Sequence, residues 1–317
     1  MNKDSYIYII SENCIFENNQ KWIIDVFANE FIEYSGLNFT TNIEQANIIW
    51  IIGYNLQKID LISKLEKKPF IIMTIHHIDW NNNNETIKTI EKLDPIVDVY
   101  HVICEKVKID MGRLTKKKII QANFWINEKN FYKIDNKEEL RKKWKLDNDN
   151  YIVGSFQRDT MGKNKCMLPK LSKGPDILLK VVQAMKMERP NIVVLLTGRR
   201  RNYIMRELDS ANIKYVYYEM VTVSELNELY NCLDLYIVSS RVEGGPRSIM
   251  ECGLAKTPII STDVGIASLI MNSDAIYDME NTDSYKNAKV DIDYVYEKTM
   301  RYSISNYMKE FMHTVFF

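Results

Sequence analysis

Short apolar runs alternate with longer mixed segments along the whole chain, which is the pattern of β-strands alternating with α-helices. Several runs, such as residues 70–75, are nearly continuous and rich in isoleucine, which suits a parallel sheet covered on both faces. We therefore expect an α/β protein with doubly wound parallel sheets. The expected strands are 5–10, 48–52, 70–75, 97–103 and, more weakly, 119–122 in the first half, and 151–156, 192–197, 214–218, 233–238 and 258–261 in the second.

A polar, charged stretch from 127 to 150 interrupts this alternation and contains no core strand. Because 317 residues exceed the usual size of one hydrophobic core, we expect two domains, 1–145 and 146–290. Helical spacing predicts helices over 20–33 and from Gly174 onward, where Pro175 suits a first turn. The segment 291–317 is expected to form one long amphipathic helix packed on the body, with a membrane-surface helix as the alternative that its mixed charges make less favourable. Its spaced apolar residues are Ile292, Tyr296, Met300, Ile304, Met308, Phe311 and Val315.

The composition is that of an ordinary globular protein, with 46% hydrophobic and 26% charged residues. The 42 basic residues balance 42 acidic ones, so no global field would attract nucleic acid, and an anionic ligand must be held locally. Five separated cysteines, no signal-peptide pattern and no apolar run of ~20 residues predict a reduced, cytoplasmic protein. Glycine is scarce, with 11 residues, so the places where it clusters are informative.

Several common catalytic motifs are missing from the sequence. It contains neither G-x-G-x-x-G after the first expected strand nor G-x-x-x-x-G-K-[ST], which weighs against nicotinamide dehydrogenases and P-loop nucleotidases. It also contains neither G-x-S-x-G nor H-E-x-x-H.

The densest unusual segment, 239–251, directly follows an expected strand. Gly244, Gly245 and Pro246 should open a helix there, and its exposed N–H groups and positive dipole end suit a diphosphate. Glu243 precedes this helix and Glu251 lies about five residues inside it, so two acceptors flank the phosphate position. The alternative is an ordinary helix start followed by a salt-bridged glutamate.

This segment has the pattern Ser-Ser-Arg-x-Glu-Gly-Gly-Pro-x4-Glu and is followed by Pro258 to Gly265. It resembles the E-x7-E signature of the retaining glycosyltransferases of family 4, the group 1 glycosyltransferases. The resemblance implies a GT-B fold, in which two Rossmann-like domains face a cleft, the N-terminal one binding the acceptor and the C-terminal one the nucleotide-sugar donor. It further implies that Glu243 contacts the donor hexose and Glu251 the nucleotide ribose. The other donor-binding residues that it implies are Gly244, Gly245, Pro246, Arg247, Ser248 and Gly198. The family often has glycine where Lys256 stands here.

Arg158 and Lys173 resemble the arginine and lysine with which the family clamps the two donor phosphates. A guanidinium and an ammonium would offset the negative charge of a departing nucleoside diphosphate whatever the kinship. Because the loop 160–170 is longer than in many relatives, Lys170 and Lys165 remain alternatives to Lys173. The plain alternative for the pair is two solvated basic side chains. The triplet Arg199 to Arg201 ends another expected strand and is most simply a solvated loop, with assistance to the diphosphate or to an acidic acceptor as the alternative.

His76 and His77 end an expected strand of the first domain. The resemblance maps a T-x-H motif onto His76, near the transferred sugar, and leaves open which of the two histidines faces it. A packed or capping histidine pair is the alternative. Adjacent strand residues point opposite ways, and no further ligand cluster accompanies them, so we predict no metal site.

The residues and the resemblance together predict a glycosyltransferase that moves a hexose-type sugar, with retention, from a nucleoside-diphosphate sugar to a hydroxyl acceptor. The expected acceptor is a hydroxyl of a glycan, a glycolipid or a protein. We expect no cofactor and no metal, because protein cations would fill that role. Since family members often act on lipid-linked acceptors, peripheral membrane contact is an option, although Lys116 to Lys118 are most simply solvated. The rival functions are a sugar-nucleotide epimerase, a phosphorylase and a nucleotide-sugar-binding protein without turnover. The base, sugar, linkage and oligomeric state stay open.

Overall fold

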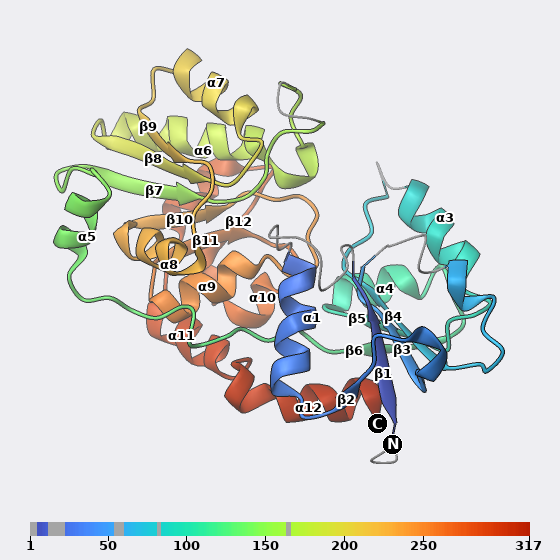
Figure 1. Cartoon of the computed structure of the whole chain (residues 1–317). Coiled ribbons are helices and arrows are strands. Elements are labelled where there is room, and N and C mark those ends of the chain that lie inside the picture. Colours follow the sequence, from blue (N-terminus) through green and yellow to red (C-terminus); the bar gives the residue numbers. More distant parts are fainter. Residues whose placement is uncertain (1–4, 12–22, 54–59, 81–83, 163–165) are drawn as a thin grey trace. The chain divides into compact units, whose positions relative to one another are not determined.

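The computed structural model describes residues 5–11, 23–53, 60–80, 84–162 and 166–317, and within them the chain forms two compact units. The first unit comprises Met1–Trp125 and Ile304–Phe317, and the second comprises Ile126–Ser303. Each contains a six-stranded sheet whose neighbouring strands all run parallel (Figure 1). The predicted residues 20–22, Cys14 and Lys165 lie outside the described ranges.

The sheet of the first unit has the strand order β2-β1-β3-β4-β5-β6. The strands are β1 (Tyr6–Ile10), β2 (Asn38–Phe39), β3 (Ile48–Ile51), β4 (Phe70–Ile75), β5 (Val99–Val102) and β6 (Lys118–Gln121). The α-helices of this unit are α1 (Ile23–Tyr34), α3 (Asn84–Leu93), α4 (Glu105–Met111) and α12 (Ile304–Phe316).

An aromatic cluster joins α1, β3 and α12 in the core of the first unit. Phe31 on α1 stacks on Phe316 of α12 with ring centroids 5.0 Å apart, and it meets Trp50 of β3 edge-on at 4.9 Å. Phe311 of α12 packs on Trp125 at 5.0 Å. Since large aromatic side chains contribute much of the apolar area that a core buries, α12 is an integral part of this unit.

The sheet of the second unit has the order β12-β11-β10-β7-β8-β9, the arrangement of dinucleotide-binding doubly wound folds. The strands are β7 (Tyr151–Ser155), β8 (Ile192–Thr197), β9 (Tyr215–Tyr218), β10 (Leu235–Val238), β11 (Ile259–Thr262) and β12 (Ile276–Tyr277). The α-helices are α5 (Lys137–Lys143), α6 (Pro175–Glu188), α7 (Asn202–Ser210), α8 (Val223–Cys232), α9 (Arg247–Ala255), α10 (Ala267–Ile270) and α11 (Ile292–Met300).

Both faces of this second sheet are covered, which explains its nearly continuous apolar strands. Val194 and Ile237 share one buried cluster with residues of α6 and α7. Tyr236, whose side chain alternates to the other face, packs against Tyr230 of α8 with ring centroids 5.4 Å apart. Figure 1 shows α6 and α7 on one side of this sheet and α8 and α9 on the other. The predicted α/β class with two doubly wound parallel sheets is thus confirmed.

The ten predicted strands all form, with ends that differ by one or two residues. The two that the sequence did not indicate, β2 and β12, are two-residue strands at sheet edges, too short to show an apolar pattern. The four described cysteines are free thiols. No helix in the described part of the chain has both the length and the apolar character needed to cross a membrane.

The prediction of one helix over 291–317 is wrong, because α11 ends at Met300 and α12 begins at Ile304. Between them the backbone pairs with another segment: the N–H of Ile126 donates to the carbonyl of Tyr302 at 2.8 Å, and Ile126 bridges Ser303. Helical spacing of apolar residues continues across this break, so the pattern alone does not reveal it. Helix α11 packs on α9 in the second unit, and α12 belongs to the first.

Along the chain, the boundaries between the two compact units fall after Trp125 and after Ser303, whereas the sequence pattern suggests boundaries near 145 and 290. The intervening residues 126–145 are fastened to α8 by polar groups. The N–H of Tyr132 donates to Asn227 Oδ1 at 3.0 Å, and that of Ile134 donates to Asn231 Oδ1 at 2.8 Å. The polar composition that resembles a linker therefore reflects how this segment attaches to the second unit.

Candidate active site

The strand order of the second unit reverses between β7 and β10, and the loops that follow these two strands diverge there. In open parallel sheets such a switch point, at the carboxyl ends of the strands, is where ligands bind. The loop after β7 carries Arg158 and the loop after β10 carries Glu243. The fold thus brings two predicted site residues, far apart in sequence, to one edge of one sheet.

Lys173 and Glu243 form an ion pair at this edge, through Nζ and Oε1, and both side chains are largely buried. Ser240 Oγ also reaches Glu243 Oε1, at 3.2 Å. Gln157 bridges the two loops, since its Nε2 donates to the carbonyl of Lys173 at 2.7 Å while its Oε1 accepts from Ser240 Oγ at 3.0 Å. The structure therefore joins the predicted phosphate-binding lysine and the predicted hexose-binding glutamate in one hydrogen-bonded network.

A close approach of backbone holds the Lys173 and Glu243 loops together. Gly174 has φ +58°, and a Cβ there would lie 1.8 Å from the carbonyl oxygen of Ser239, so only glycine fits. Arg241 forks onto both carboxylate oxygens of Asp176 at 2.7 and 2.6 Å, and its backbone N–H donates to the carbonyl of Ser172 at 2.8 Å. These contacts fix the relative positions of the two loops.

Two further cations adjoin Arg158 and Lys173. The pKa of Lys170 is lowered to about 8, mainly by burial and also by the positive charges of Lys173, Arg158 and Arg200, while Glu243 opposes them. Burial also lowers the pKa of Arg158, with the charge of Arg200 adding to the effect. We call Arg158, Lys170, Lys173 and Arg200 the cation cluster. Lys170, the alternative to Lys173 that the sequence left open, therefore belongs to the same cluster as Lys173.

Helix α9 begins at Arg247, with Pro246 in the N-cap position one residue before it. Glu251 lies on this helix and is buried; its Oε2 accepts from the hydroxyl of Tyr230 at 2.7 Å, and Arg247 Nε lies 3.3 Å from Oε1. Burial raises the pKa of Tyr230 well above its usual range, so this phenol remains a donor. Nothing in the sequence pattern singles out Tyr230, which lies on α8.

The remaining predicted donor residues lie near the same edge of the sheet. Gly244 precedes α9, and its carbonyl packs so closely on Gly265 that a Cβ at Gly265 would lie 2.2 Å from it. Ser248 is in the first turn of α9. Gly198 follows β8, where its N–H donates to the backbone carbonyl of Glu219 at 3.0 Å and its own carbonyl accepts from the hydroxyl of Tyr217 at 3.0 Å.

In the first unit, His76 follows β4, and its Nε2 lies 2.7 Å from the carbonyl oxygen of Ile52, just after β3. Its ring stacks on Phe124 with centroids 5.8 Å apart. Burial lowers the pKa of His76 to about 4, which the bond to Ile52 opposes, so the imidazole is neutral near pH 7. His77 is half-buried. Among the described residues, no group of three or more His, Cys, Asp or Glu side chains is arranged to hold a metal ion.

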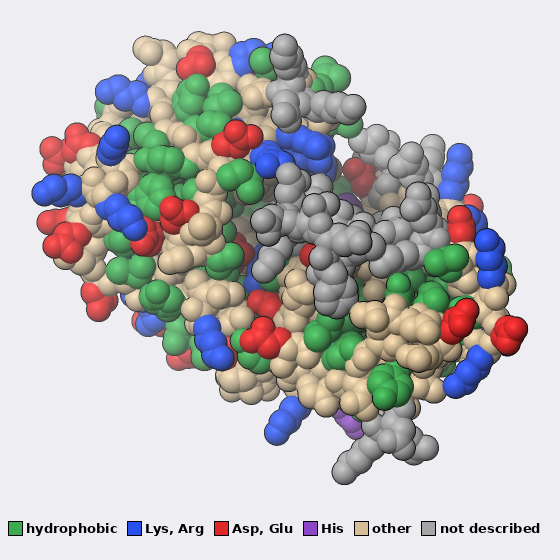
Figure 2. All heavy atoms as spheres, in the orientation of Figure 1, with side chains coloured by type: hydrophobic (Ala, Val, Ile, Leu, Met, Phe, Trp, Pro, Cys, Tyr) green, Lys and Arg blue, Asp and Glu red, His purple; other side chains and the backbone are tan. Residues whose placement is uncertain are grey.

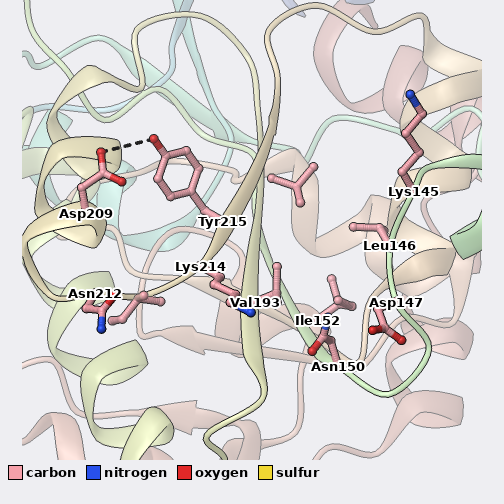
Figure 3. Close-up of a pocket in the computed structure, with 12 residues that line it drawn as sticks. Lys145, Leu146, Asp147, Asn150, Ile152, Val193, Asp209, Asn212, Lys214 and Tyr215 are labelled. Carbon is pink, nitrogen blue, oxygen red and sulfur yellow. Dashed lines mark hydrogen bonds between the residues drawn. The ribbon is translucent and has the colours of Figure 1, made fainter.

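A cavity of about 620 Å³ lies at the opposite edge of the second sheet (Figure 3). Its lining includes Ile152, Val193 and Tyr215, which lie at the amino ends of β7, β8 and β9. None of the predicted site residues lines it. On the molecular face drawn in Figure 2, acidic and basic side chains are interspersed, in keeping with the balanced net charge.

Three comparisons with known proteins bear on this site. Residues 166–291 match the family described as glycosyl transferases group 1. The match covers most of the second unit. The matched residues include Lys170, Lys173, Glu243 and Glu251, while Arg158 precedes them. A comparison with curated proteins finds no match.

Solved glycosyltransferase structures share the fold over most of the chain. Sucrose-phosphate synthase from Thermosynechococcus elongatus is 14% identical, with a TM-score of 0.68 over 92% of this chain and 77% of that one. Anabaena HepE, solved with UDP and glucose, is 13% identical, with a TM-score of 0.65 over 91% and 80%. A glycosyltransferase from Rickettsia africae is 15% identical, with a TM-score of 0.62 over 94% and 82%. These similarities in fold confirm the predicted GT-B fold.

Proposed function

We propose that this protein is a glycosyltransferase that transfers a hexose-type sugar from a nucleoside-diphosphate sugar to a hydroxyl of an acceptor, with retention of the anomeric configuration. The observation that carries the proposal is the cation cluster beside Glu243 at the switch point of the unit that matches the group 1 glycosyl transferases. Neighbouring folds solved with UDP and with UDP-glucose support a nucleotide-sugar donor.

In this proposal the cation cluster binds the diphosphate and stabilises the charge that grows on it as the sugar leaves. Fixed cations in a largely buried site act strongly on developing charge, because they need no reorganisation during the reaction. The amino end of α9, preceded by Gly244 and Gly245, adds backbone N–H groups and the positive end of a helix dipole.

The two glutamates take the roles that the family resemblance implies. Donor binding replaces the Lys173–Glu243 contact in part: Lys173 turns to phosphate and Glu243 accepts from hexose hydroxyls. Ser240 and Gln157, which already hold this network, keep Glu243 oriented. Glu251 accepts from the ribose, and Tyr230 holds its carboxylate through the other oxygen. For His76 we keep the implied hydrogen bond to the transferred sugar.

Retention follows, in this proposal, from displacement on one face of the sugar. The bond from the anomeric carbon to the diphosphate oxygen breaks, the acceptor oxygen bonds to that carbon on the same face, and the acceptor proton passes to the departing phosphate. No carboxylate is assigned as a covalent nucleophile. We further propose that the cation cluster takes the place of a divalent metal, so that turnover persists in a chelator.

A panel of nucleoside diphosphates and their sugars tests the donor. A ligand that binds only the folded protein raises its thermal midpoint, so a stabilising member identifies the base. Release of the free nucleoside diphosphate with a hydroxyl acceptor then measures turnover, and the anomeric proton coupling of the product reports retention.

The possible outcomes distinguish the proposed transferase from the alternative functions. Stabilisation without release from any donor sugar would point to a binding protein of the same fold. Isomerisation of the sugar without release would point to an epimerase. An inverted product would overturn the retention, and loss of turnover in a chelator would overturn the metal independence.

A further inference from the structure

Arg201 is the most deeply buried charged side chain near the site, with 0% of its surface exposed. It directly precedes α7, and its Nε pairs with Asp159, which is 1% exposed. Its Nη1 donates to the carbonyl of Ser155 at 2.5 Å and to that of Thr197 at 2.8 Å. These are the last residues of β7 and β8. One guanidinium therefore ties together the carboxyl ends of two neighbouring strands and the loop after β7.

Asp159 extends this connection to two more segments. Its carboxylate accepts from Thr160 Oγ1 at 2.9 Å, and its carbonyl accepts from the N–H of Lys170 at 2.7 Å. The N–H of Thr160 in turn donates to the carbonyl of Arg200 at 3.0 Å. Arg200 adopts φ +63°, a conformation that side chains other than glycine seldom take, and this bond helps to hold it there.

The segments joined in this way carry three members of the cation cluster. Arg158 precedes Asp159, Arg200 precedes Arg201, and Lys170 is bonded through its backbone to Asp159. Burial is the main cause of the lowered pKa values of Arg158 and Lys170, but neighbouring cations contribute as well: Arg200 to that of Arg158, and Arg158 and Arg200 to that of Lys170. These like charges therefore lie close enough to repel one another. Mobile loops would relieve this repulsion by moving apart, so a rigid attachment beneath them is needed to keep the charges together.

A buried ion pair often adds little to the stability of a fold, because desolvation of the two charges offsets their attraction. Apolar residues of similar volume often stabilise the protein as much or more. The contacts of Arg201 with two strand ends and one loop make it more suited to fixing geometry. Building on the function proposed above, we propose that Arg201 and Asp159 are positioning residues that hold Arg158, Lys170 and Arg200 at the spacing of a diphosphate before the donor binds. Such preorganisation lowers the cost of binding and of charge stabilisation.

The same unit offers a matched control at the other edge of its sheet. Arg141 Nη2 pairs with Asp234 Oδ2 at 2.6 Å, and Arg141 is also buried. Asp234 Oδ2 accepts from the N–H of Ile152, near the start of β7, and Arg141 Nε donates to the carbonyl of Cys232 at 2.9 Å. This pair fastens the amino ends of strands in the same sheet, away from the cation cluster.

The experiment measures inorganic pyrophosphate affinity by calorimetry and thermal midpoint for the whole chain and for Asp159→Asn and Asp234→Asn. Pyrophosphate tests the cation cluster independently of any base. Both variants should lower the midpoint, but only Asp159→Asn should weaken pyrophosphate, by on the order of tenfold to a hundredfold, as expected for misplaced binding groups. Equal affinity of Asp159→Asn and the unchanged protein, or an equal loss in Asp234→Asn, would overturn the positioning role.

A second variant covers the case in which Asp159→Asn does not fold. Replacing both partners, Asp159→Leu with Arg201→Met, removes the charges while filling the space, and such exchanges are often well tolerated. This variant should fold and still bind pyrophosphate more weakly. Its full affinity would overturn the inference. An unchanged protein that binds neither pyrophosphate nor any nucleoside diphosphate would instead overturn the proposed function itself.

Discussion

The two units have the same layered architecture but opposite chemistry at the carboxyl ends of their strands. In the second unit the edge of the sheet carries four cations, a paired glutamate and two close backbone approaches, at Gly174 and Gly265. In the first unit His76 is neutral, lies on Phe124 and is bonded to the carbonyl of Ile52. A parallel sheet supplies the place for a ligand, whereas the side chains after each strand decide what kind of ligand it holds.

The difference also shows what each kind of site requires beneath it. Clustered like charges need support that resists their repulsion, and the second unit has a buried Arg201–Asp159 pair at that edge of its sheet. A neutral imidazole needs only one hydrogen bond and one stacking partner to fix its ring. The following experiments test this contrast, beginning with the largest expected effect.

Arg158→Ala should lower turnover by on the order of 10²–10³-fold, because it removes a fixed cation facing the developing charge. The thermal midpoint should change little, since the described contacts of this side chain include one hydrogen bond, from Nε to the carbonyl of Thr160 at 3.1 Å. Arg199→Ala, in an exposed residue of the arginine triplet, is the control. A variant at Arg158 that simply unfolds would favour a structural role for this residue.

Glu251→Ala should weaken nucleoside-diphosphate binding by on the order of 1–3 kcal/mol, the size of a lost hydrogen bond to a charged group. Tyr230→Phe removes only the hydroxyl that holds Oε2 and should cost less affinity. Calorimetric titration of both variants measures this. Unaltered affinity in Glu251→Ala would take Glu251 out of the site.

Nucleoside-diphosphate affinity should fall as pH rises through about 8, because the Lys170 ammonium with its lowered pKa is charged below that pH and neutral above it. Lys170→Met should weaken binding about tenfold at pH 7 and flatten the profile between pH 7 and 9.5. Lys180→Met on α6 changes an exposed lysine and should leave the profile as it was. A wild-type profile retained in Lys170→Met would contradict the assignment.

The smallest effect is expected in the first unit. With a pKa of about 4, His76 stays neutral from pH 5.5 to 8, so kcat should show no inflection near 6.5 that depends on it. His76→Ala should lower kcat about tenfold through the lost hydrogen bond, with nucleotide affinity unchanged. Comparison of the two pH profiles checks this, and an inflection that disappears in His76→Ala would show that the imidazole titrates during turnover.

Apolar runs predicted the long strands well, because a strand buried on both faces leaves a clear pattern in the sequence. They missed β2, β12 and the break at 301–303, since two-residue strands have no pattern and the break depends on pairing with distant Ile126. Glu243 and Lys173 were predicted as site residues from their local motifs. Their direct contact depends on how two loops approach, which local sequence does not encode.

The arginine triplet shows that the sequence alone does not predict how deeply each of three adjacent side chains is buried. Arg199, Arg200 and Arg201 are identical in type and adjacent, yet they are exposed, half-buried and fully buried respectively. The interpretation of a solvated loop fits only the first of them. Because the buried partner, Asp159, comes from another loop, only the three-dimensional structure separates the three roles.

The helix α12 has a consequence for synthesis on the ribosome. Most of the first unit precedes the second in the sequence, but its aromatic core includes Phe311 and Phe316, which follow the second unit. The second unit is continuous from Ile126 to Ser303. The first unit must therefore wait until α12 has been translated, after the whole second unit, before its core is complete.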